Sequence, residues 1–410
     1  MKFKLLPLAI GAAVAAQAGA VMADASVYGK INLSAQQVSF DYLGSDKDAI
    51  TGLETKSTSK DASQYLLNTN TSRLGVKGKN KLSDDLDAVY KMEFEVVADT
   101  GDAGSASNSS PFKTRNIVGG LSSKTWGTIQ AGKNDTVLKM LADGTDQFND
   151  LLIGDITHYM VGENRQSNIL MYTSPTWSGF TLGFTDELSE DSGVSTGATS
   201  NDETGFLERY SLSGKYAFND TSFIGLAADH NIKNADIVRL VGAATFGDFT
   251  FDAHIQQASV SNNDLSDNGI KGELGEGIGG STGLENALGN ALGASDAGAL
   301  AFYKDIKEQD AWMVNGKYQM GDWAFKAQYG QSTSESAINA SGPAFAAKHT
   351  FDAKQIALGV DYSLSKNTIV YGYGAKLTVD TDKVNLWAGN AGSNDNADLK
   401  TIGVGFETKF

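Results

Sequence analysis

TRNIVGGLSSKTWGTIQAG at residues 114–132 and NRQSNILMYTSP at residues 164–175 are short alternating stretches on either side of a long polar connection. That connection, residues 133–164, is about thirty residues long, a length at which a loop is usually either functional or disordered. Its apolar residues argue against disorder: Val137, Leu138, Leu141, Phe148, Leu151, Leu152 and Ile153. Its carboxylates argue against a dry core: Asp135, Asp143, Asp146, Asp150 and Asp155. We therefore expect a packed loop whose acids face Arg115 and Arg165 of the flanking strands across water.

The composition excludes several classes of protein. The 410 residues carry a formal net charge of −16 and no cysteine, which disfavours nucleic-acid binding and excludes disulfides and thiolate metal sites. The four histidines, His158, His230, His254 and His349, show no metal-ligand spacing, so we expect no metal and no cofactor.

The amino terminus has the features of a secretory signal peptide. Lys2 and Lys4 precede an apolar run from Leu5 to Val14, and small residues lead to Ala23. This run is too short to span a membrane as a helix, so we predict a cleaved segment 1–23 and a single mature domain, 24–410. No later stretch holds eighteen consecutive apolar residues, which excludes a helical membrane protein.

The mature chain is a series of units with period-two alternation, the mark of strands with one apolar and one wet face. From Asp24, residues Val27, Gly29, Ile31, Leu33 and Ala35 alternate with Tyr28, Lys30, Asn32, Ser34 and Gln36. After Asp85, the wet face of the next clear unit holds Asp87, Lys91, Glu93 and Glu95. The other units are Ser72–Gly78, Thr114–Ser123, Gly127–Gly132, Asn168–Thr173, Phe180–Asp186, Phe206–Phe218, Ser222–His230, Asp236–Phe246, Phe249–Ala258, Asp310–Met320, Trp323–Gln331, Phe351–Leu364, Asn367–Asp380 and Asp398–Phe410, sixteen in all.

Short turns and long polar stretches alternate between these units. The long stretches are Asp41–Ala62, Ala98–Lys113, Lys133–Gln166, Glu187–Gly205, Ser259–Gln309, Ser332–Thr350 and Thr381–Ala397, with one short exception at Asn231–Ala235. Such alternation indicates an up-and-down antiparallel sheet with one trimmed rim and one elaborated rim. A twisted sheet with an even number of sixteen strands can close on itself.

The apolar face of this sheet could cover a soluble sandwich core or face lipid. The opposite face is charged in nearly every unit, which favours a membrane barrel that is apolar outside and polar inside. Aromatic residues lie near the short turns, as in an interfacial girdle: Trp126, Trp177, Phe180, Tyr216, Phe218, Trp323 and Tyr362. We therefore predict an all-β, sixteen-stranded antiparallel transmembrane β-barrel with short periplasmic turns, long extracellular loops and an inward-folded third loop.

Wet-face cations indicate how the lumen would act on solutes. Arg73 and Lys77 share the wet face of their strand, so both are expected to point into the lumen. Fixed cations opposite fixed carboxylates would set a transverse field that ranks ions by charge. In the alternative interpretation these cations merely pair with neighbouring lumen acids. The Gly/Ala-rich stretch 265–301 is interpreted as a flexible surface loop rather than as a cover for the pore mouth or a segment that binds a partner.

Several motifs together resemble the Gram-negative general porins from Asp24 to Phe410: VYGKINL, SRLGVKG, KTRNIVGGL, WGTIQAGKND, NRQSNILMYTSPTWSGF and the terminal GVGFETKF. The resemblance implies a homotrimer in the outer membrane of a Gram-negative cell, in contact with outer-membrane lipid and lipopolysaccharide. It also implies a pore narrowed by the third loop. Phe406 and Phe410 resemble the signal read by the barrel-assembly machinery.

The resemblance also assigns pore residues. Lys30, Arg73, Arg115 and Arg165 match the basic cluster on one wall of the porin constriction. Asp143 lies where the opposing loop carboxylates begin. The next acidic position of the family is Gln147 here, which makes Asp146 and Asp150 the expected substitutes.

The function expected from these features is passive diffusion of ions and small hydrophilic solutes. Two alternatives share the barrel, a solute-specific channel such as one for sugars and a loop-mediated adhesin or receptor. A barrel-embedded hydrolase would need a nucleophile–base motif, and the sequence has none.

Overall fold

The computed structural model describes residues 24–47, 54–101, 110–188, 206–261, 306–337, 348–381 and 395–410. The predicted signal peptide 1–23 and the Gly/Ala-rich stretch 265–301 lie outside these ranges. Within them, no helix has the length and apolar character needed to cross a membrane.

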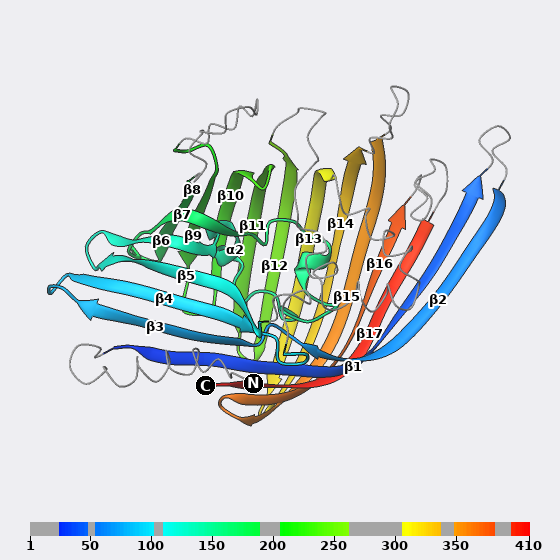
Figure 1. The fold of residues 1–410 in the computed structure, drawn as a ribbon, viewed down its shortest axis with the longest axis horizontal. Coiled ribbons are helices and arrows are strands. Elements are labelled where there is room, and N and C mark those ends of the chain that lie inside the picture. Colours follow the sequence, from blue (N-terminus) through cyan, green and yellow to red (C-terminus); the bar gives the residue numbers. More distant parts are fainter. Residues whose placement is uncertain are drawn as a thin grey trace, which may run out of the picture.

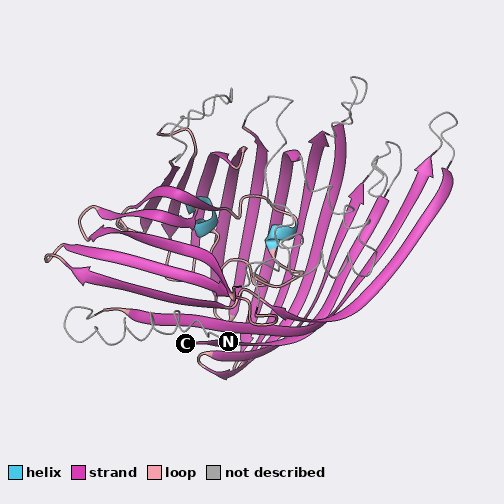
Figure 2. Ribbon diagram, viewed as in Figure 1, coloured by secondary structure: helices cyan, strands magenta, loops and turns pink. Residues whose placement is uncertain are grey.

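Strands make up most of the described chain (Figure 2). They are β1 (Ser26–Lys47), β2 (Glu54–Thr69), β3 (Arg73–Lys81), β4 (Leu86–Val96), β5 (Phe112–Ser123), β6 (Gly127–Asp135), β7 (Arg165–Thr173), β8 (Phe180–Glu187), β9 (Tyr210–Ala217), β10 (Phe223–Ile232), β11 (Ala235–Phe246), β12 (Phe249–Val260), β13 (Ile306–Met320), β14 (Trp323–Ala337), β15 (Lys348–Ser365), β16 (Thr368–Thr381) and β17 (Asp395–Lys409). Between β6 and β7 lie two short helices, α2 (Val137–Leu141) and the 3₁₀ helix η1 (Ile156–His158).

The sheet is antiparallel throughout and closes on itself. From β3 to β17 each strand pairs with the next, and β17 pairs with β1 from Lys30–Lys409 to Gly44–Asp395. Strands β2 and β3 share one position in the barrel, since β1 pairs with β3 near its start and with β2 from Leu33 onward. The break between them lies at residues 70–72, where Thr71 has a φ of 49°. Seventeen segments thus fill sixteen strand positions, which confirms the predicted barrel (Figure 1).

The two faces of the barrel are polarised as expected for a wall in lipid. Outward apolar side chains are open to the surroundings, with Val27 64% and Val404 65% exposed. Inward polar side chains are buried, among them Asn32, Gln256 and Gln355. A soluble barrel would have the opposite arrangement, because water favours polar exteriors.

Aromatic side chains gather on the outer surface near the short turns. Trp126, Trp177, Phe180, Tyr216, Phe218 and Trp323 are all exposed, and Trp323 packs against Tyr362 with ring centroids 4.7 Å apart. This position fits an aromatic girdle at a membrane interface.

Several predicted strand ends are wrong. The stretch Asp41–Ala62, predicted as a loop, continues β1 to Lys47 and starts β2 at Glu54. Strands β14 and β15 likewise extend into the predicted loop Ser332–Thr350, whereas β9 starts at Tyr210 and not at Phe206. Backbone pairing continues beyond the end of the apolar alternation, because ladder hydrogen bonds do not require apolar side chains.

Candidate functional site

Loop L3, defined here as residues 136–164, folds into the barrel between β6 and β7. Its first turn is α2, where the hydroxyl of Thr136 caps the helix by accepting from the backbone N–H of Lys139. The backbone N–H of Leu138 donates to Ser211 Oγ on β9 at 3.1 Å. Leu138 and Leu141 are buried in the same apolar cluster as wall residues of β10 and β11. The entry of the loop is therefore anchored to the wall at β9–β11.

Lumen-facing amides hold the far part of L3 by its backbone. Gln328 Nε2 and Gln355 Nε2 each donate to the carbonyl of Gly154 at 2.8 Å. Gln256 Nε2 donates to the carbonyl of Val161 at 2.9 Å, and the backbone N–H of Val161 donates to Gln309 Oε1 at 3.0 Å. The glutamine amides of the wall and the backbone groups of the loop are buried polar groups that need hydrogen-bond partners. Wall and loop therefore satisfy each other's hydrogen-bonding groups.

Wall glycines make room for two large loop side chains. A Cβ at Gly330 would lie 2.1 Å from the hydroxyl oxygen of Tyr159, and one at Gly359 would lie 3.0 Å from the Phe148 ring. Tyr159 and Phe148 are fully buried, so their rings fill the space that the missing side chains leave. The apolar loop residues named from the sequence are all buried, which confirms the prediction of a packed loop.

The tip of L3 touches the wall cations of β1 and β3 directly. Asp150 Oδ2 lies 2.8 Å from Lys30 Nζ and 2.6 Å from Arg73 Nη2. Burial alone would raise the pKa of the Asp150 carboxyl, but Lys30, Arg73 and Arg115 hold that pKa below its usual range. The loop is therefore tethered by ion pairs to the strands opposite its anchor on β9–β11.

The other two predicted cations pair with acids of the strands. Arg115 Nε donates to Glu93 Oε1 at 2.9 Å, and Arg165 Nη2 lies 2.9 Å from Asp135 Oδ1. Asn116 joins the second pair by donating to Asp135 Oδ2 at 2.9 Å. This matches the alternative interpretation for Arg115 and Arg165, in which lumen cations pair with neighbouring wall acids.

The other three aspartates of L3 differ from one another. Asp143 is exposed and lines the lumen cavity. Asp146 is buried, and its two oxygens accept from the backbone N–H groups of Phe148 and Ile156 at 2.8 and 3.0 Å. Asp155 accepts from the backbone N–H of Asp150 at 2.7 Å. Asp146 and Asp155 thus shape the turn that presents Asp150.

Burial raises the pKa of both Asp146 and Asp155, the two acids that shape this turn. For Asp146, burial is reinforced by the negative charge of Asp155, and its pKa lies well above the usual range. For Asp155, burial outweighs the opposing influence of His158. Burial lowers the pKa of His158, which favours its neutral form.

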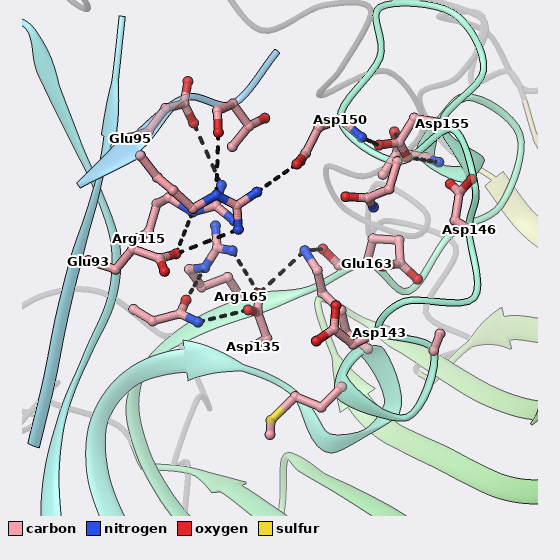
Figure 3. A pocket seen from close by; sticks show the side chains of 18 of the residues that line it. Glu93, Glu95, Arg115, Asp135, Asp143, Asp146, Asp150, Asp155, Glu163 and Arg165 are labelled. Carbon is pink, nitrogen blue, oxygen red and sulfur yellow. Dashed lines mark hydrogen bonds and ion pairs between the residues drawn. The ribbon is translucent and has the colours of Figure 1, made fainter. Parts of the chain in front are cut away.

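A cavity of about 600 Å³ lies between L3 and the wall formed by β3–β7. The ionisable side chains around it come from both sides, as Figure 3 shows for Arg115 and Arg165 on the wall and Asp150 and Asp155 on the loop. Six are cationic, namely Arg73, Lys91, Lys113, Arg115, Lys139 and Arg165. Eight are acidic, namely Glu93, Glu95, Asp135, Asp143, Asp146, Asp150, Asp155 and Glu163. The cavity is therefore lined by side chains of both charges.

Sequence reasoning missed most partners of the predicted site. Glu93 was recognised as a wet residue but not as the partner of Arg115, and Glu407, 3.2 Å from Lys30 Nζ, was not considered. Asp135 was expected to face the arginines only as one of five acids, and the structure pairs it with Arg165. The backbone-holding amides Gln256, Gln309, Gln328 and Gln355 were not singled out. Their only signal was wet-face parity, which many other polar residues share.

A closed antiparallel barrel with an apolar exterior, a charged interior and loop L3 folded into its lumen defines a β-barrel protein of the bacterial outer membrane. The family model of the Gram-negative porins matches residues 9–383, and the chain belongs to this family.

Relatives agree with this assignment. Outer membrane porin protein 32 of Delftia acidovorans is 28% identical over 207 residues, which cover 48% of this chain and 52% of that protein. The match thus spans about half the length of that relative. The solved anion-selective porin from Comamonas acidovorans has a TM-score of 0.57 at 20% identity, with 94% of this chain and 99% of that chain covered. The trimer form of OmpT of Vibrio cholerae has a TM-score of 0.52 at 15% identity, with 92% and 98% covered. These two structures are similar in fold.

Proposed function

We propose that this protein forms a water-filled channel across the outer membrane for passive diffusion of ions and small hydrophilic solutes. The observation that carries the proposal is the cavity between L3 and β3–β7, lined by six cationic and eight acidic side chains. Charged side chains around a space large enough for water inside a lipid-facing barrel are the features that let a pore rank ions and solutes by charge. Porin relatives and the fold they share support the same conclusion.

The constriction that we propose has two sides. On the wall stand Lys30, Arg73, Arg115 and Arg165, and on L3 stand Asp143 and Asp150. Asp146 belongs to the loop side as a shaping residue, because its oxygens are occupied by loop amides. Charge selectivity would follow from the balance between the two sides.

Planar-bilayer recording tests this function. The protein reconstituted in a bilayer is expected to give discrete conductance steps, with a reversal potential under a salt gradient that reports ion preference. A complete lack of conductance from correctly folded protein would refute the channel function.

We propose that three copies associate, as the trimer form of OmpT does. Unheated protein in mild detergent is expected to migrate as an oligomer and, after boiling, as a monomer of 43.3 kDa or slightly less. In bilayers, channel closure is expected in three equal steps. A single-step closure together with monomeric migration before heating would argue for a monomer.

The carboxyl-terminal strand is proposed to carry the assembly signal. Ile402, Val404 and Phe406 lie on the outer face of β17, and exposed Phe410 follows directly after it. The backbone N–H of Phe410 donates to the carbonyl of Gly29 at 3.1 Å. Deleting Phe410 removes this closing contact and the terminal aromatic ring. The amount of barrel in outer-membrane fractions is expected to fall while synthesis stays unchanged. Replacing exposed Phe218 at a short turn with alanine serves as the control, and equal loss in both variants would argue against a specific signal.

A further inference from the structure

Glu93 occupies the centre of the cationic wall. Its Oε1 accepts from Arg115 Nε at 2.9 Å and lies 4.0 Å from Arg73 Nη1, while Lys91 Nζ lies 3.6 Å from Oε2. The hydroxyl of Tyr28 donates to Oε2 at 2.9 Å. The Glu93 side chain is only 4% exposed, so three cations and a phenol share one nearly enclosed carboxylate.

Two local features of the strands produce this arrangement. The β4–β5 register shifts between Met92 and Phe94, so Glu93 faces a bulge that contains both Arg115 and Asn116. A bulge turns consecutive side chains toward one face, and here both point into the lumen. On the other side Glu93 pairs with Gly75. A Cβ at Gly75 would lie 2.5 Å from Tyr28 Cζ, so the glycine lets the Tyr28 ring reach Glu93.

Glu93 lies next to the place where the loop meets the wall. Arg73 contacts Glu93 through Nη1 and the loop carboxylate of Asp150 through Nη2. The field of Arg73 and Arg115 is therefore partly cancelled by a fixed negative charge on their own side of the passage. A nearby wall acid, Glu95, is more exposed and lies farther from Arg115, at 3.8 Å.

We infer that Glu93 is a specificity-determining residue of the channel, which holds the wall arginines in place and reduces their preference for anions. This inference rests on the proposed channel function. It predicts that the wall attracts anions more strongly when the Glu93 charge is removed and its hydrogen-bonding shape is kept. The substitution Glu93→Gln removes the negative charge and keeps a hydrogen-bond acceptor, because the amide oxygen can still accept from Arg115.

The test is the reversal potential under a salt gradient for four reconstituted channels: native, Glu93→Gln, Arg115→Gln and the double variant. Glu93→Gln is expected to raise the anion-to-cation permeability ratio roughly two- to fivefold, the scale of one unit charge a few ångströms from a wet pore. Arg115→Gln is expected to lower the ratio. The double variant, which restores the native net charge, is expected to return close to the native value.

Asp84→Asn is the matched control, since it removes a carboxylate from an exposed turn. Among the described residues, the Asp84 carboxylate forms an ion pair only with Lys81. It is expected to leave the ratio unchanged. A purely structural role for Glu93 would alter conductance or assembly without moving the ratio toward anions.

Equal reversal potentials for native and Glu93→Gln channels, or an equal shift in Asp84→Asn, would overturn the inference. If Glu93→Gln alone does not assemble, the double variant compared with Arg115→Gln measures the same charge change, and equal values in that pair would overturn it too. Failure of the channel function itself is distinguishable, because the native protein would then not conduct.

Discussion

Arg73→Gln channels are expected to favour cations more than the native protein does, with the difference growing as the salt concentration falls. The substitution removes the guanidinium that lies 2.6 Å from Asp150 and leaves Lys30 as the remaining close partner of that carboxylate. Two unit charges about 4 Å apart interact by roughly 1–4 kcal/mol at effective dielectric constants from 80 down to 20. Screening lengths grow from about 8 Å at physiological salt to about 30 Å at 0.01 M, which explains the salt dependence. Reversal potentials at several salt concentrations measure the effect.

As the pH falls, the attraction for cations should weaken at a higher pH in the Arg73→Gln channel than in the native channel. Arg73 is one of the cations that lower the pKa of Asp150. Without it the pKa rises, so the carboxylate takes up a proton at a higher pH than in the native channel. The loss of negative charge then reduces the attraction for cations as pH falls.

Lys81→Gln is the control for Arg73→Gln, because it removes one positive charge from the same strand at an exposed position beside Asp84. It is expected to behave like the native protein at every salt concentration. We would assign selectivity to another part of the chain if Lys81→Gln shifted the reversal potential and Arg73→Gln did not.

Tyr159→Ala is expected to release L3 from its seat on the wall. Truncating a fully buried aromatic ring to alanine costs about 3–5 kcal/mol through lost contacts and an empty cavity. The strand ladder does not depend on this ring, so the barrel should still form while the loop opens locally. We expect faster protease cleavage within residues 136–164 and noisier, larger single-channel currents.

Two further variants identify the cause of that effect. Tyr159→Phe keeps the ring and is expected to retain the native loop. Gly330→Leu fills the same space from the wall, where even a Cβ would lie 2.1 Å from the Tyr159 hydroxyl, and is expected to reproduce the behaviour of Tyr159→Ala. Native protease resistance in both Tyr159→Ala and Gly330→Leu would mean that the amide contacts alone hold L3.

The sequence by itself determined the architecture of this barrel. Successive side chains of a strand point to opposite faces, so alternation in β4 or β17 reports both the strand and its lipid side without knowledge of any partner. Turn and loop lengths then set the antiparallel order, and the apolar residues of L3 indicated that it packs. Strand ends beyond the apolar alternation were missed, as in β1 and β2, because polar strands and polar loops have similar composition.

Only the tertiary structure decided which charges meet. Lys30 contacts Asp150 and Glu407, which lie 120 and 377 positions away in the chain, and no local pattern encodes such separations. The bulge opposite Glu93 depends on strand register, and the path of L3 depends on wall amides and glycines from distant strands. Alternation places a side chain inside the lumen, but its ionic partner is set by closure of the barrel, because closure brings distant strands and the loop to one level.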